Sequence, residues 1–288
     1  MRRLTKKAAI IGWIVLSLLL LVSCESGSSS GSLTEEADFS ITFIDVGQGD
    51  AALVSCDGHY MLIDGGPTGA GDDVRNVLMD NNVTKLDYLI ISHMHKDHIG
   101  GLKKALSYVS MVGKTLSVEG EDDSDEYYDF HVELLADGCN SIDVPKEGER
   151  FSLGKATIDV IAVGDPSVNK NDSLVVLITY KKTTFLFTGD MQYPMEGKIC
   201  DKYSDNFPIT LLKVAHHGAE ESTEGRFLSA TMPRYAVISV GAGNRYGHPT
   251  EKVISALEQA NVEIFRTDQN GNITVLSDGK KLSIQTEK

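Results

Sequence analysis

The chain of 288 residues is poor in cysteine, and its four cysteines show no CxxC spacing. Cys24 stands in an N-terminal segment of unusual composition, which leaves Cys56, Cys139 and Cys200 for the rest of the chain. An odd number without paired spacing allows at most one disulfide and predicts no cysteine-ligated metal site. No internal repeat is evident.

Positive charge is also scarce. Lysine and arginine number 27 against 41 aspartates and glutamates, so the formal net charge is −14. An acidic surface repels nucleic acid at long range, because phosphate binding normally depends on lysine and arginine displacing counterions. This argues against a DNA substrate, although bound metal ions could supply positive charge locally. With 41% apolar and 24% charged residues, the composition is otherwise that of a globular protein.

The first 23 residues differ from the rest. Four basic residues between positions 2 and 7 precede an apolar run over 8–22, and the sequence at 21–24 is LVSC. A basic head, an apolar middle and small residues before the cut predict a secretory signal peptide over 1–23. The final residues resemble a bacterial lipobox, which implies cleavage before Cys24 and lipidation of its thiol. An uncleaved transmembrane anchor is the alternative.

Either alternative predicts a protein tethered to the extracellular face of the bacterial cell membrane. Residues 24–38 comprise the lipidated cysteine and a polar Ser/Gly-rich stretch, which predicts a flexible linker. Residues 39–288 then form the folded domain. Removal of 1–23 leaves 23 basic and 41 acidic residues, so the mature chain would carry a net charge of −18.

The most informative stretch lies at residues 92–101 and reads SHMHKDHIGG. The apolar, β-branched run before it predicts a buried strand over 86–91, and the apolar period after it predicts a helix over 99–109. The stretch therefore occupies a strand-to-helix turn. Four of its ten side chains are of types that bind divalent metals.

The spacing of these four side chains suits a pair of metal ions. Alternate residues of an extended segment share a face, so His93, His95 and Asp97 can point the same way, and the tightening chain brings His98 beside Asp97. Imidazole with carboxylate suits Zn, Mn or Fe, and the lack of a nearby cysteine argues against a closed structural zinc site. We expect two divalent metal ions, Zn or Mn.

Strand patterns recur along the chain with helical patterns between them. The predicted strands cover residues 39–46, 51–56, 60–64, 86–91, 174–180, 184–188, 209–215, 235–240, 262–265 and 273–276, and a further hairpin spans 151–163. The predicted helices cover 72–82, 99–109, 125–136 and 251–260. Two strand-rich halves, each with helices, predict an α/β fold of four layers, an αββα sandwich. In this fold the polar strand ends open onto one edge.

Two of these strand ends would complete the metal site. Asp190 ends the apolar strand in FLFTGD, where a carboxylate costs free energy unless it is paired, and it is the natural bridge between two ions. His216 and His217 follow the next strand, and one of them would complete the ligands of the second ion. The other would support the site or hold substrate. The sequence does not decide between them.

Other polar groups are expected around the ions. Asp64 follows a strand in LIDGG and either fixes an imidazole through its free N–H or bonds its own backbone in the turn. The loop at 244–248 offers Arg245, Tyr246 and His248, which suit a phosphate oxygen and a departing alkoxide.

SHMHKDHIGG resembles the HxHxDH signature of the metallo-β-lactamase superfamily. Together with IDVGQGDA at 44–51, LIDGG at 62–66, NDSLVV at 171–176, FTGD, LKVAHHG and SVGAGNRYGHP, it looks like the soluble hydrolase domain of ComEC competence proteins, which take up DNA. These motifs span almost all of residues 39–250. The resemblance assigns the metal motifs to His93, His95, Asp97, His98, Asp190, His216 and His217.

This chain also departs from the superfamily pattern. Asn171 and Ser173 stand where many members have a third histidine, which argues against β-lactam or glyoxalase II-type chemistry, and they are expected to support substrate or a water. Ala219 replaces a serine usual in relatives. The multi-helix membrane channel is absent, so the chain is not expected to translocate DNA by itself.

We expect a monomeric, lipid-anchored, extracellular binuclear hydrolase of phosphodiesters, with Asp97, His217 and His248 as catalytic residues. Its first version is a ComEC-like nuclease acting on single-stranded DNA. A second version resembles the phosphorylcholine esterase that acts on cell-surface teichoic acid, because an acidic protein suits a zwitterionic head group. A third hypothesis is a non-catalytic, metal-binding surface lipoprotein.

Overall fold

The computed structural model describes residues 38–120, 124–136 and 141–288. The signal peptide, Cys24, residues 25–37 of the linker and Cys139 lie outside the described residues. Within these ranges no helix is long and apolar enough to cross a membrane.

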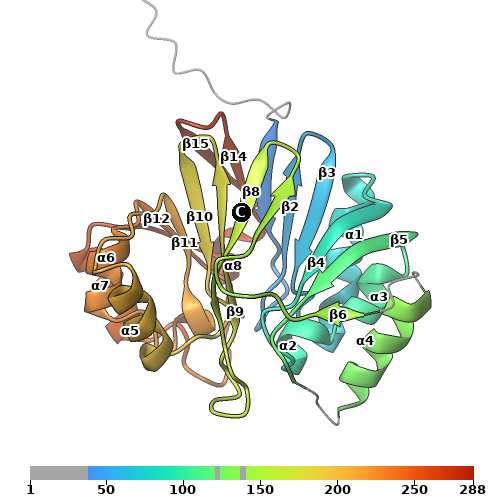
Figure 1. Ribbon diagram of the computed structural model, residues 1–288, viewed down its shortest axis with the longest axis horizontal. Helices are drawn as coiled ribbons and strands as arrows, with labels where there is room; N and C mark the ends of the chain where they lie inside the picture. Colours follow the sequence, from blue (N-terminus) through green and yellow to red (C-terminus); the bar gives the residue numbers. More distant parts are fainter. Residues whose placement is uncertain (1–37, 121–123, 137–140) are drawn as a thin grey trace, which may run out of the picture. The chain divides into compact units, whose positions relative to one another are not determined.

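Two mixed sheets form the centre of the domain (Figure 1). The first has the strand order β15-β14-β1-β2-β3-β4-β5-β6, and the second has the order β13-β12-β11-β10-β9-β8-β7. The first sheet contains β1 (Phe39–Phe43), β2 (Ala52–Cys56), β3 (His59–Ile63), β4 (Lys85–Ile90), β5 (Met111–Leu116), β6 (Ile142–Asp143), β14 (Ile273–Ser277) and β15 (Leu282–Thr286). The second contains β7 (Arg150–Leu153), β8 (Ala156–Val163), β9 (Leu174–Tyr180), β10 (Thr183–Phe187), β11 (Leu211–Lys213), β12 (Tyr235–Ile238) and β13 (Glu263–Arg266).

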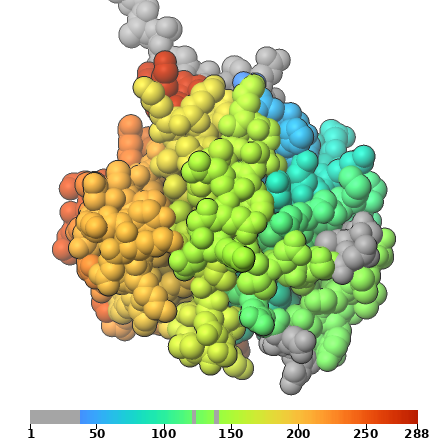
Figure 2. Space-filling view, viewed as in Figure 1, coloured from blue at the N-terminus to red at the C-terminus, as the bar shows by residue number. Residues whose placement is uncertain are grey.

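Helices cover the outer face of each sheet (Figure 1). The first sheet is covered by α1 (Gly71–Asp80), α2 (Lys96–Ile99), α3 (Leu102–Leu106) and α4 (Asp125–Ala136), and the second by α5 (Tyr193–Lys202), α6 (Gly225–Thr231) and α7 (Glu251–Gln259). A short α8 (Thr267–Asn270) follows β13. Figure 2 shows the same division on the surface, with blue-to-green residues on one side and yellow-to-orange residues on the other. The predicted αββα sandwich is confirmed.

The two sheets pack face to face through apolar side chains. Along β9 the residues at 174, 176, 178 and 180 point between the sheets, because side chains alternate across a strand. Aromatic rings join the layers: Phe39 stacks on Tyr180 and on Phe185, with ring centroids 4.9 and 5.0 Å apart. Phe43 stacks on Phe187 at 5.6 Å, close to the edge where the polar residues gather.

Parallel pairing brings the polar strand ends together. In the first sheet β3, β4 and β5 are parallel, and in the second β10, β11, β12 and β13 are parallel. The carboxyl ends of parallel strands meet at one edge, so the segments after β3, β4, β10, β11 and β12 become neighbours although they are far apart in sequence.

The helix predicted over residues 99–109 is wrong as a single element. It is divided at Gly100 and Gly101 into the short α2 and α3. The Gly101 N–H donates to the Gly66 carbonyl over 2.9 Å, and a Cβ on Gly101 would lie 2.2 Å from the Gly65 carbonyl oxygen. The break lets the metal-motif turn pack against the turn that follows β3.

Candidate metal centre

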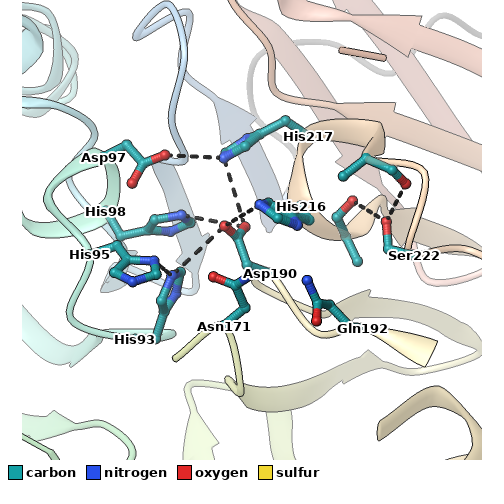
Figure 3. Close-up of polar contacts among 12 residues, drawn as sticks. His93, His95, Asp97, His98, Asn171, Asp190, Gln192, His216, His217 and Ser222 are labelled. Carbon is teal, nitrogen blue, oxygen red and sulfur yellow. Dashed lines mark hydrogen bonds and ion pairs between the residues drawn. The ribbon is translucent and has the colours of Figure 1, made fainter. Parts of the chain in front are cut away.

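Asp190 lies at the centre of the candidate site (Figure 3). It follows β10, and its backbone N–H donates to the Ser173 hydroxyl over 3.0 Å. The intervening Gly189 has a φ of +50° and no room for a Cβ, which would lie 2.6 Å from the Ser173 oxygen. These constraints aim a buried carboxylate into a ring of imidazoles.

The two oxygens of Asp190 face two different groups of side chains. Oδ2 lies 3.7 Å from Nε2 of His93 and 3.7 Å from Nε2 of His216. Oδ1 lies 3.4 Å from Nε2 of His98 and 3.7 Å from Nε2 of His217. These separations are long for hydrogen bonds but fit atoms that share an ion at about 2.0–2.2 Å from each. Asp190 is therefore placed to bridge two cations.

The ligand groups that could hold these cations come from both sheets. His93, His95 and Asp190 form the first group, with ligand atoms all within 4.8 Å of one another. Asp97, His98, Asp190 and His217 form the second group within the same limit, and His217 Nε2 lies 3.4 Å from Asp97 Oδ2.

The sequence left open which of His216 and His217 belongs to the second group. The structure places His217 there and turns His216 toward the oxygen of Asp190 that faces His93. Both residues adopt left-handed backbone conformations, with φ of 49° and 55°, so their rings leave the chain on different sides. His216 thus lies near the first group, the one that lacks a third histidine at position 171.

The donor set fits divalent cations. His98 Nε2, His217 Nε2 and Asp190 Oδ1 are buried and have no hydrogen-bond partner within the part of the chain that the structure describes. Burial opposes protonation of His217, but Asp190 and Asp50 outweigh it and raise its pKa to about 10. The carboxylates thus favour positive charge here and keep His217 protonated. Metal ions bind neutral imidazole, so their binding would displace this proton.

Asp64 contacts a candidate ligand rather than only its own turn. Its Oδ2 lies 2.9 Å from Nδ1 of His98, and its Oδ1 and Oδ2 accept hydrogen bonds from the Ser92 N–H and hydroxyl, both over 2.8 Å. Burial raises the pKa of Asp64 despite the neighbouring His98. An imidazole whose Nδ1–H is held in this way presents Nε2 to an ion.

Sequence reasoning missed two residues, Asp50 and Lys213. The Lys213 ammonium donates to Asp50 Oδ2 over 2.7 Å, and Asp50 Oδ1 lies 3.3 Å from Nδ1 of His217. Burial opposes ionisation of Asp50, but Lys213 and His217 lower its pKa to about 2. A lysine within the apolar run at 209–215 was the available signal, because a buried ammonium needs a partner.

The loop at 244–248 reaches the site through ring contacts, edge-on between His248 and His216 and stacked between His248 and Tyr246. The side chain of Asn244 fixes the loop by donating to the His248 carbonyl over 2.6 Å and accepting from the Tyr246 and His248 N–H groups. The His248 ring lies 5.6 Å from that of His216 and 5.7 Å from that of Tyr246. Arg245 is exposed and donates to the Tyr246 hydroxyl over 2.9 Å.

Asn171 and Ser173 have different surroundings. Asn171 is half-buried, and its side chain lies beside Asp190 in Figure 3. Ser173 is fully buried, donates to the Asn171 carbonyl over 2.9 Å and accepts from the Asp190 backbone. Ser173 therefore holds Asp190 in place and itself has no exposed surface.

The sandwich of two sheets, with a histidine and aspartate cluster at the edge where parallel strands end, defines the class. The chain belongs to the metallo-β-lactamase superfamily, whose profile matches residues 44–242. Its histidines and aspartates form a candidate metal centre.

More particular similarities are to competence proteins. The chain is 28% identical over 253 residues to ComE operon protein 3 of Bacillus subtilis (strain 168), covering 81% of this chain and 32% of that protein. It is 29% identical over 265 residues to competence protein ComA of Neisseria gonorrhoeae, covering 90% and 34%. The chain thus spans about a third of the length of these curated relatives. Among solved structures, CmlA, a diiron β-hydroxylase from Streptomyces venezuelae, matches with a TM-score of 0.55 and 13% identity over 84% of this chain and 54% of that chain, which shows the shared fold alone.

Proposed function

We propose that the protein is a binuclear hydrolase of phosphodiesters, with Zn or Mn as the metal. The position of Asp190 between two ligand groups carries this proposal, because two ions sharing one carboxylate can hold both the attacking and the leaving oxygen of a displacement at phosphorus. Bound ions would supply Lewis-acid stabilisation of the phosphate oxygens and lower the pKa of the attacking water.

Bound metal ions would offset the local negative charge despite the acidic composition. Five carboxylates, those of Asp50, Asp64, Asp97, Asp190 and Glu221, lie in or against the cluster, together with the ammonium of Lys213. Two divalent ions and Lys213 would balance these five negative charges. The ions would thus remove the local repulsion of an anionic phosphodiester even though the chain as a whole repels it.

The chain's own groups have distinct roles in this proposal. Asp97 and His217 orient each other at 3.4 Å beside Asp190 and position the reacting groups. Arg245 and Tyr246 bind phosphate oxygens at the exposed rim. His248 has a buried Nδ1 without a partner in the described residues, and burial together with His216 and His217 lowers its pKa. It therefore starts neutral and would have to gain a proton, which the negative charge of a bound phosphodiester favours, before it could donate that proton to the leaving oxygen.

The first version of the substrate is single-stranded DNA, supported by the similarity to competence proteins. The second is a cell-surface phosphodiester such as choline-bearing teichoic acid, supported by the excess of acidic residues. The localisation proposed with either is the extracellular face of the membrane, with a lipid on Cys24 and the domain monomeric.

The test compares three substrates on the same metal-loaded protein: fluorescent single-stranded DNA, bis-p-nitrophenyl phosphate and p-nitrophenylphosphorylcholine. Cleavage of DNA supports the first version, and selective cleavage of the choline ester supports the second. Metal content of two ions without cleavage of any diester would instead favour the non-catalytic surface protein.

A further inference from the structure

A buried ion pair lies directly behind the second ligand group. The side chains of Lys213 and Asp50 are only 3% and 8% exposed, and they come from β11 and from the loop after β1, 163 positions apart. The ammonium also donates to the Val214 carbonyl over 3.0 Å. Such a pair is weak support for stability, because desolvation of two charges offsets most of their attraction. Its position therefore needs another explanation.

Asp50 contacts two segments that supply ligands to the second group. Its backbone N–H donates to the backbone carbonyl of Asp97 over 3.2 Å. Its carboxylate lies beside Nδ1 of His217, whose N–H also reaches the Ser239 carbonyl at 3.0 Å. Its neighbour Gly49 packs so closely that a Cβ there would lie 2.4 Å from the Asp97 carbonyl oxygen. Asp50 thus joins the metal-motif turn of one sheet to the histidine of the other.

Lys213 fixes the carboxylate with which Asp50 contacts His217. It binds Oδ2, so Oδ1 is left facing His217. A cavity of about 10 Å³ lies behind the cluster, lined by Asp50, Lys213, Asp64, Ser92, Ser239 and Gly189 among others, so the pair borders the residues that hold His98 as well.

We propose that Asp50 and Lys213 are positioning residues that set the geometry of Asp97 and His217 for one of the two ions, while the first ligand group does not depend on them. This inference rests on the proposed binuclear site. It assigns no contact with substrate to either residue.

The alternative is that Lys213 only compensates charge. The two explanations predict opposite changes in metal affinity when Lys213 is replaced. If Lys213 acts through its charge alone, Lys213→Met removes a repulsive cation and tightens metal binding. If it positions Asp50, the same substitution weakens binding of one ion, as loss of a group that orients a ligand typically does by about 10–100-fold. Asp50→Asn tests the other end of the pair, and the double variant changes no net charge.

The experiment is a titration of the metal-free, full-length protein in mild detergent with Co²⁺, followed by calorimetry and by visible absorption of the bound ion. His95→Ala and His217→Ala identify which binding step belongs to which ligand group. Leu212→Ala is the matched control, because Leu212 also lies on β11 but packs against the helices on the outer face and loses only apolar contacts.

We expect the three variants, Lys213→Met, Asp50→Asn and the double variant, each to weaken by at least about tenfold the metal-binding step that is lost in His217→Ala. The affinity of the other metal-binding step should stay within about threefold of the wild-type value. Tighter binding in Lys213→Met, or wild-type binding in the double variant, overturns the positioning role and leaves the binuclear site standing. The positioning role is also overturned if these variants weaken both metal-binding steps equally and Leu212→Ala has the same effect. Wild-type protein that binds fewer than two ions contradicts the proposed function itself, and the inference with it. If Asp50→Asn does not fold, Lys213→Met alone carries the test through its sign.

Discussion

Replacement of Asp190 by Asn should abolish the stabilisation that metal ions confer. The carboxylate is fully buried, and each of its oxygens faces one ligand group, so a neutral amide removes a charged ligand from both ions at once. An ion present at 100 times its Kd stabilises the folded state by about 2.7 kcal/mol, which for a domain of this size raises Tm by roughly 5–11 °C per ion. Asp190→Asn should show a shift near zero and no hydrolysis.

The assay is thermal denaturation with and without added Mn²⁺ or Zn²⁺, with metal content measured on the same samples. Asp172→Asn is the matched control, because Asp172 is also buried and accepts a hydrogen bond from the Asp165 N–H over 3.2 Å, but it lies outside the ligand groups. The control should keep the full shift. An Asp190→Asn protein that binds two ions with the wild-type shift would refute the bridging role.

The remaining predictions concern pH, close packing and the substrate rim. Burial raises the pKa of Glu196 from 4.5 to about 7, so the folded state binds a proton that the unfolded state has lost. The free energy of unfolding therefore falls by roughly 3 kcal/mol as pH rises from about 4.5 to 7. In urea denaturation, Glu196→Gln should lose correspondingly less of this free energy between about pH 5 and 7.5. Gly49→Ala should weaken binding of the ion at Asp97 by at least about tenfold in a calorimetric titration, because the new Cβ meets a backbone oxygen that cannot rotate away. Arg245→Ala should raise KM for a diester while the free energy of unfolding changes by less than about 0.5 kcal/mol, whereas Arg234→Ala, which removes a guanidinium stacked on Tyr235 in the same way, should leave KM unchanged. If single-stranded DNA is cleaved, the logarithmic slope of KM against salt should stay below about 2, because few cations are available to displace counterions, and a steep slope would contradict this.

Local patterns made much of the site predictable. The spacing within HMHKDH fixes four side chains through one turn, so their proximity follows from backbone geometry alone. Asp190 could be placed because an unpaired carboxylate at the end of an apolar strand is costly. The four-layer fold followed from the order of strand and helix patterns.

Other features depend on geometry that residue patterns do not encode. His216 and His217 are adjacent and chemically identical, and only their consecutive left-handed conformations send them toward different oxygens of Asp190. The pairing of Asp50 with Lys213 requires the docking of two sheets. The sequence patterns also missed β5, β6, β15, α5, α6 and α8. For α5 the reason is local, since Pro194 and Gly197 weaken the helical signal.

The division of ligands between the sheets has a mechanical consequence. Asp97 and His98 follow β4 of the first sheet, whereas Asp190 and His217 follow β10 and β11 of the second, and the first ligand group is divided in the same way. Each ion would therefore be bound from both sheets, beyond the stacked rings of Phe43 and Phe187 that end the apolar packing. Without ions, several carboxylates and imidazoles face one another between the two sheets, and the buried ammonium of Lys213 lies among them. Bound metal ions would thus stabilise the contact between the sheets at this polar edge, so the candidate metal centre and the closure of that edge would depend on the same ligands.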